Sequence, residues 1–152
     1  MKIPVELADQ FSVGASLETA FELLADVPRS VSHFPDIAKL QPLGDGAYRW
    51  ELKPLGAAGI QHQVVYASRY VADAAARTVV WTAVSGVGNG VMQGHWRLRA
   101  QGQGTHIDFL NRGELEVPVP MLFRAAAKPV VQGLFQKQVR DYLDNIRRSL
   151  AA

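Results

Sequence analysis

The last thirty residues constrain the fold most, because they alone form a long stretch with helical periodicity. Apolar residues recur there every three or four positions, at Val131, Phe135, Val139, Tyr142, Ile146 and Leu150. Residues 47 to 117 alternate instead with a period of two, as antiparallel strands with one buried face do. That face needs a cover, and only a C-terminal helix from Met121 to Leu150 is long enough to supply it. Pro129 should kink this helix or stand in the first turn of a helix that restarts there.

Turn signals rich in glycine separate the expected strands. The strands are expected at Ala47 to Lys53, Ile60 to Val71, Thr78 to Val84, Val91 to Ala100 and Thr105 to Val117. Residues 54 to 59 are expected to form a loop. The glycines of residues 86 to 90 also indicate a loop, and since no helix follows them they do not form a phosphate-binding motif.

The N-terminal third predicts one strand followed by two short helices. Val5, Leu7, Phe11 and Val13 place a strand over residues 3 to 13, mostly at a period of two. Ser16 is a typical N-cap for a helix that should end near Asp26, because Pro28 disfavours helical geometry in the residue before it. A second helix is expected from Arg29 to Phe34. The complete pattern predicts an α+β fold in which a curved antiparallel sheet of about six to seven strands surrounds the C-terminal helix.

Length and composition limit the classes of protein to which the chain can belong. Its 152 residues suit a single domain spanning 1–152, with enough apolar residues for a real core. Cysteine is absent, which excludes disulfides and thiolate chemistry. The formal net charge of +2 is too small to indicate nucleic-acid binding. No signal peptide or membrane-spanning run is visible, so we expect a soluble cytoplasmic protein without stable membrane insertion.

Large aromatic side chains fall on the predicted inner face of the sheet. Trp50, Trp81 and Trp96 lie on three different strands, Phe109 lies on the last strand, and Phe135 lies on the helix. Buried tryptophans usually need a partner for the indole N–H. These residues either form an ordinary aromatic core or line a ligand cavity, and we select all five as candidate ligand-binding residues.

Polar residues also point inward and are further candidates. Tyr66, Ser68, Tyr70 and Asn111 share the inner face, and all but Tyr70 are selected as ligand-binding candidates. In a dry core such groups pair with one another, whereas in a cavity they meet water or ligand. His62 is selected as well. It is either a satisfied histidine at a strand end, or a neutral imidazole that orients a ligand carbonyl or acts as a base.

Catalytic and metal-binding motifs are not evident. The four histidines, His33, His62, His95 and His106, lack the spacing of a zinc site, so no metal and no cofactor are predicted. Asp26 and Asp36 flank the second helix and are expected to cap helix ends rather than to form a catalytic pair. We therefore assign no catalytic residue from the sequence.

Three loose motifs and the final helix together resemble a known superfamily. The motifs are Phe11-Ser12-Val13-Gly14-Ala15-Ser16 leading into the first helix, His33-Phe34-Pro35-Asp36-Ile37 before the sheet, and Gly94-His95-Trp96-Arg97-Leu98 followed by Gly104-Thr105-His106-Ile107. With the terminal amphipathic helix, they resemble the SRPBCC superfamily of START-like, helix-grip proteins. That superfamily includes polyketide cyclases, lipid-transfer domains and coenzyme Q-binding proteins. Pro35-Asp36 differs from the Pro-Gly typical of the branch associated with carbon monoxide dehydrogenase.

The resemblance implies that a hydrophobic small molecule is held between the sheet and the C-terminal helix. We therefore expect binding or transport of a lipid, polyketide or isoprenoid, without catalysis. One alternative is a polyketide cyclase or aromatase-like enzyme, which needs an inward acid–base pair. The other is a protein–protein interaction module without a ligand, which predicts a filled core and an exposed apolar patch. The oligomeric state and the ligand's identity stay open.

Overall fold

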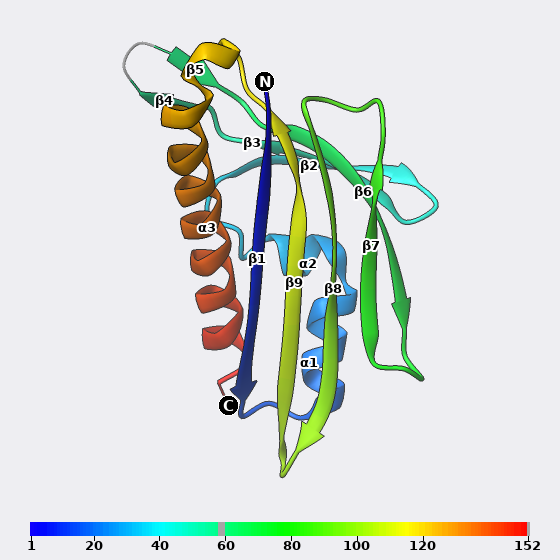
Figure 1. Cartoon of the computed structure of the whole chain (residues 1–152). Coiled ribbons are helices and arrows are strands. Elements are labelled where there is room, and N and C mark those ends of the chain that lie inside the picture. The colour runs from blue at the N-terminus through cyan, green and yellow to red at the C-terminus, as the bar shows by residue number, and fades with distance from the viewer. Residues whose placement is uncertain (58–59, 152) are drawn as a thin grey trace.

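A computed structural model describes residues 1–57 and 60–151, and it shows a seven-stranded antiparallel sheet that curves around one long helix (Figure 1). The strands of this sheet are β1 (Lys2–Val13), β2 (Ile37–Gly44), β3 (Ala47–Leu52), β6 (Val65–Asp73), β7 (Thr78–Val84), β8 (Gly90–Gln101) and β9 (Gly104–Glu116). The helices are α1 (Leu17–Ala25), α2 (Val27–Val31) and α3 (Arg124–Ser149), with a 3₁₀ turn, η1 (Met121–Phe123), before α3. This is the helix-grip architecture that the sequence predicts.

The strand order is β1-β9-β8-β7-β6-β3-β2. Strands that follow one another in the chain within this sheet lie side by side, except that β1 pairs with β9 and not with β2. Trp96 on β8 lies opposite Phe109 on β9, and Trp81 on β7 lies opposite Gly94 on β8. A Cβ atom at Gly94 would lie 2.0 Å from the Leu110 carbonyl oxygen and 2.8 Å from the Trp81 ring. Glycine at this position therefore lets the strands bend closely around the indole of Trp81.

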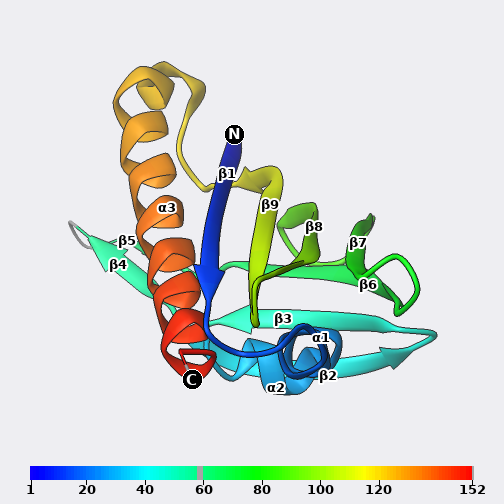
Figure 2. The same ribbon diagram turned by 90° about the horizontal axis from the view of Figure 1, so that it is seen from below.

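Helix α3 lies along the inner side of the sheet, and α1 and α2 close one end (Figure 2). The amide N–H of Ala15, just before α1, donates to the carbonyl of Leu150 at 3.0 Å, which ties the end of α3 to that corner. Asn145 Nδ2 also donates to the carbonyl of His33, at 2.8 Å. The far end of α3, where the helix begins, has no such ties to α1 or α2 among the described residues.

Several helix boundaries differ from the sequence prediction: α2 ends at Val31 rather than Phe34, and α3 begins at Arg124 rather than Met121. Helix α2 begins at Val27 rather than Arg29, because the Asp26 carboxylate accepts from the Arg29 amide at 3.3 Å and caps the helix two residues earlier. Pro28 is tolerated because the first turn of a helix needs no N–H from that residue. Helix α3 continues through Pro129 from Arg124, so of the two outcomes expected at Pro129, a kink or a restart of the helix, the restart is wrong.

The expected loop of residues 54–59 and the expected single strand from Ile60 to Val71 are also corrected. β4 (Leu55–Ala57) pairs with β5 (Ile60–His62) in a separate hairpin, and residues 58–59 of that loop lie outside the described residues. The strand is then interrupted, and β6 starts only at Val65. The Asn89 side chain explains the break, because its amide accepts from the Val65 N–H and donates to the Gln63 carbonyl, at 2.9 and 2.7 Å.

Candidate functional site

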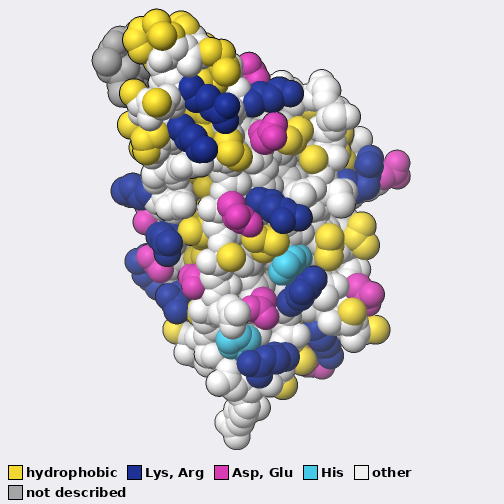
Figure 3. Space-filling view, in the orientation of Figure 1, with side chains coloured by type: hydrophobic (Ala, Val, Ile, Leu, Met, Phe, Trp, Pro, Cys, Tyr) yellow, Lys and Arg dark blue, Asp and Glu magenta, His cyan; other side chains and the backbone are white. Residues whose placement is uncertain are grey.

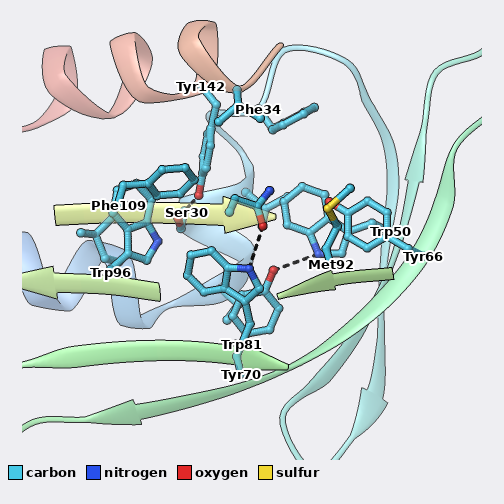
Figure 4. A pocket seen from close by; sticks show the side chains of 15 residues that line it. Ser30, Phe34, Trp50, Tyr66, Tyr70, Trp81, Met92, Trp96, Phe109 and Tyr142 are labelled. Atoms are coloured by element: carbon cyan, nitrogen blue, oxygen red, sulfur yellow. Dashed lines mark hydrogen bonds between the residues drawn. The ribbon is translucent and has the colours of Figure 1, made fainter. Parts of the chain in front are cut away.

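The interior between the sheet and α3 contains two adjacent spaces. A small inner cavity of about 30 Å³ lies deep against the aromatic residues of the sheet (Figure 4). A larger groove of about 540 Å³ lies between the first half of α3 and the strands. The two spaces share five lining residues: Phe34, Tyr66, Met92, Asn111 and Val139. They therefore form one site with a deep end and a mouth.

The groove has strongly apolar walls. The α3 side is formed by residues one helical turn apart, including Ala127, Val130, Leu134 and Gln138, while the segment 117–119 and Phe123 complete the mouth. Val130 and Leu134 are 59% and 44% exposed. Figure 3 shows hydrophobic side chains gathered at the end of the molecule where α3 begins. The apolar stripe of α3 is thus only partly covered by the sheet, as it must be if an apolar molecule is to enter.

Charged side chains are absent from the described lining of both spaces, since no Asp, Glu, Lys or Arg contributes to either. The titratable groups there are tyrosines and His62. Burial raises the pKa of the Tyr66 and Tyr142 hydroxyls far above the ordinary value of 10.0, so both hydroxyls stay protonated at neutral pH. Burial lowers the pKa of His62 below its ordinary value of 6.5, so the imidazole is neutral.

Aromatic rings build the inner cavity from five strands and α3. Trp50 stacks on Tyr66 with ring centroids 5.4 Å apart, and Trp96 packs on Phe109 at 4.5 Å. Trp81 packs between Trp96 and Tyr70, at 6.4 and 5.5 Å. The rings hold one another in fixed orientations, and each such pair adds about 0.5–1.5 kcal/mol beyond burial alone.

Hydrogen bonds fix several polar groups of this aromatic cluster. Trp50 Nε1 donates to the Tyr70 hydroxyl at 3.1 Å, and Trp81 Nε1 donates to Asn111 Oδ1 at 2.9 Å. The hydroxyls of Ser30 on α2 and Tyr142 on α3 lie 2.5 Å apart (Figure 4). The last contact joins the two helices directly over the cavity.

Eight of the nine residues selected from the sequence line this site. Trp50, Trp81, Trp96 and Phe109 line the inner cavity, His62 and Phe135 line the groove, and Tyr66 and Asn111 line both. Ser68 lines neither. It is fully buried within the sheet, where its hydroxyl donates to the Met92 carbonyl at 2.8 Å. Whether any of these residues binds a ligand stays a prediction.

Sequence reasoning did not select several lining residues. Phe34, Ser30 and Tyr142 close the deep end, and Val130 and Leu134 form part of the mouth. A sequence signal for the last two exists, because they widen the apolar stripe of Val131, Phe135 and Val139 by one position on each turn. Ser30 carried no such signal, since its role depends on where α3 crosses α2.

Among the described residues, one buried side-chain polar atom has no hydrogen-bond partner, and that atom is Nε2 of His62. An orphaned buried nitrogen of this kind costs about 1–3 kcal/mol unless something satisfies it. His62 also borders the depression beside Met1 and Asn89, at the outer edge of the mouth. The imidazole therefore stands at the entrance of the groove, as a neutral group with unused hydrogen-bonding capacity.

Among the residues described, no helix is long and apolar enough to cross a membrane. Within the same residues, no group of three or more His, Cys, Asp or Glu side chains is arranged to hold a metal ion.

Solved structures with the same architecture come from several bacteria. A Thermus thermophilus protein, TTHA0849, aligns with a TM-score of 0.70 and 18% identity, covering 95% of this chain and 96% of its own. The Zhui aromatase/cyclase of Streptomyces sp. R1128 aligns with a TM-score of 0.70 and 17% identity, covering 97% and 93%. A START superfamily protein of Mycobacterium smegmatis gives 0.70 and 14%, covering 95% and 96%. At such identities the likeness shows the fold alone.

No curated protein sequence matches the chain. A sequence profile of one protein family, described as polyketide cyclase / dehydrase and lipid transport, matches residues 4–151. The match covers both sides of the site, from β1 to the end of α3. Together with the helix-grip fold, it shows that this chain belongs to the polyketide cyclase / dehydrase and lipid transport family within the START-like SRPBCC superfamily.

Proposed function

We propose that the chain binds and carries a hydrophobic small molecule, such as a lipid, polyketide or isoprenoid, in the groove between the sheet and α3. The observation that carries the proposal is the groove itself: about 540 Å³ of space with apolar walls and no charged residue in its described lining. Ligand sites for small molecules are typically concave and apolar, with a few polar groups that set specificity. His62, Tyr66, Asn111 and Gln138 supply such groups.

The two alternatives fit the same features less well. A cyclase-like enzyme needs an acid and a base facing the substrate, and the described lining offers His62 without a carboxylate partner. An interaction module without a ligand predicts a filled interior, which a groove of this volume does not match. Exposed apolar residues do occur, but Phe123, Val130 and Leu134 also line the groove, so the proposal accounts for their exposure.

Binding of a dansyl-labelled fatty acid tests the proposal. Trp50, Trp81 and Trp96 surround the inner cavity, so excitation of tryptophan should transfer energy to a dansyl group in the groove and give a saturable signal. Ala127→Phe places a ring into the groove, where overpacking of about 1–3 kcal/mol should weaken binding roughly tenfold. Ala125→Phe is the matched control on the same helix, because Ala125 is exposed and lines neither space.

The proposal fails if the folded wild-type protein gives no saturable transfer. It also fails if Ala127→Phe and Ala125→Phe bind the probe as tightly as each other, because binding would then lie outside the groove.

A further inference from the structure

We infer that the inner cavity, where it opens into the groove, is a subsite for a neutral carbonyl oxygen at the buried end of the ligand, held by Tyr66 and Asn111. The inference rests on the proposed function, because it assigns the chemical class of ligand that the same site takes. The basis of the inference is that some polar atoms of the lining residues form hydrogen bonds with one another, whereas others have no partner.

The orientation of the Asn111 amide is set by Trp81. An indole N–H can only donate, so the Asn111 atom 2.9 Å from Trp81 Nε1 is the acceptor oxygen. The amide nitrogen of Asn111 must then point away from Trp81. Among the described residues it has no hydrogen-bond acceptor, and Asn111 lines both the inner cavity and the groove. The amide therefore offers the interior a group that only donates.

Two more donors that line the inner cavity lack partners, Tyr66 on the side of Trp50 and Trp96 on the side of Phe109. The Tyr66 hydroxyl and Trp96 Nε1 make no hydrogen bond to other described residues, in contrast to Tyr70, Tyr142 and the other two indoles. Both residues line the inner cavity (Figure 4). His62 Nε2 is the one unpartnered side-chain polar atom that is sealed from solvent among the described residues. The unpaired atoms of Tyr66, Trp96 and Asn111 therefore face space that a water molecule can enter.

The size and charge of the cavity determine which acceptor fits. About 30 Å³ suits one or two waters, or the tip of a carbonyl group, since a water needs about 10–15 Å³ of such space. No cation is among the described residues that line the cavity, so a carboxylate there would be buried without a counter-charge. The Tyr66 pKa is raised by burial, which keeps its hydroxyl a donor. The unpaired donors of Tyr66 and Asn111, without a cation among the described lining residues, favour a neutral carbonyl over an acid or a hydrocarbon.

A matched pair of probes tests this inference. 2-Acetylnaphthalene carries a ketone, and 2-ethylnaphthalene has the same skeleton with a methylene in place of the carbonyl. The measured quantity is the ratio of their dissociation constants in each variant, from quenching of tryptophan fluorescence. Tyr66→Phe removes one hydroxyl and little else, so the ketone should lose about three- to tenfold in affinity relative to the hydrocarbon, the equivalent of one hydrogen bond.

Tyr48→Phe is the matched control, because Tyr48 lies on the neighbouring strand and lines neither space. Its ratio should equal that of the wild type. A second readout is spectroscopic: the carbonyl ¹³C resonance of labelled 2-acetylnaphthalene bound to the wild type should lie downfield of its value in hexane, and it should lie less far downfield when the probe is bound to Tyr66→Phe.

An unchanged ratio in Tyr66→Phe, with saturable binding of both probes, overturns the carbonyl subsite and leaves the proposed function standing. The carbonyl subsite is also overturned if the ¹³C resonance of the bound ketone matches its value in hexane. If neither naphthalene nor the dansyl-labelled fatty acid binds the folded protein, the proposed function fails, and the subsite fails with it.

Discussion

The contact between Ser30 and Tyr142 should be a measurable source of stability, because it joins α2 to α3 by one buried pair of hydroxyls. The two oxygens lie 2.5 Å apart, and the residues are 3% and 6% exposed. Among described residues, neither hydroxyl has another hydrogen-bond partner. Tyr142→Phe or Ser30→Ala alone therefore removes the bond and leaves one hydroxyl unpaired.

The expected magnitudes follow from that geometry. Each single substitution should lower the free energy of unfolding by about 1–3 kcal/mol, the cost of leaving a buried polar group unsatisfied. The double variant leaves no orphan hydroxyl, so it should cost less than the sum of the two single changes. The difference, an interaction energy of about 1 kcal/mol, corresponds to the net value of one hydrogen bond.

Urea denaturation of the wild type, both single variants and the double variant measures this cycle. An unchanged dependence on urea concentration in all four proteins shows that the same surface is exposed on unfolding, so the midpoints can be compared. Additivity of the two single effects, to within about 0.3–0.5 kcal/mol, would refute the reasoning. It would mean that water in the inner cavity satisfies either hydroxyl as well as its partner does.

Three further predictions test the interior. Val64 lines the groove and is 8% exposed, so Val64→Asp should abolish binding of the dansyl-labelled fatty acid or unfold the protein. Val71 is 61% exposed, so the control variant Val71→Asp should do neither. Trp96→Phe should change ligand affinity by about 1 kcal/mol and cost modest stability; if it lowers only the melting temperature, Trp96 is simply a core residue. Burial lowers the pKa of His62 from its ordinary 6.5, so the unfolded chain binds more protons below that pH. The free energy of unfolding, measured by urea titration at several pH values, should therefore fall as pH decreases through 6.5, and it should fall less in His62→Leu. An equal change of that free energy with pH in both proteins would show that His62 does not contribute.

Part of the polar interior was predictable from strand alternation, and part was not. A period of two correctly placed Tyr66, Ser68 and Asn111 inward, because side chains on one face of a strand repeat at every second residue. It did not distinguish Ser68, whose hydroxyl donates to the Met92 carbonyl on β8, from Tyr66, whose hydroxyl is unpaired among the described residues. That difference depends on the atoms opposite each side chain, and those belong to strands far away in sequence.

The interruption between β5 and β6 shows the same limit. Residues 60–71 have the alternation of one strand, and nothing in their own sequence breaks it. The break arises because Asn89 reaches the backbone of Gln63 and Val65 from a loop more than twenty residues later. His62 consequently lies on a separate hairpin at the mouth of the groove rather than within the long inner strand.

The helix-grip architecture follows from the sequence pattern, because a run of amphipathic strands followed by one amphipathic helix has few ways to bury both apolar faces. The same pattern places Trp50, Trp81, Trp96 and Phe109 on the inner face of the strands, since side-chain alternation follows directly from backbone geometry. The sequence pattern does not specify whether the interior is a groove or a filled core. That outcome depends on where α3 begins and how far its apolar stripe, at Val130 and Leu134, extends beyond the sheet, and these are properties of packing between distant elements that no local pattern specifies.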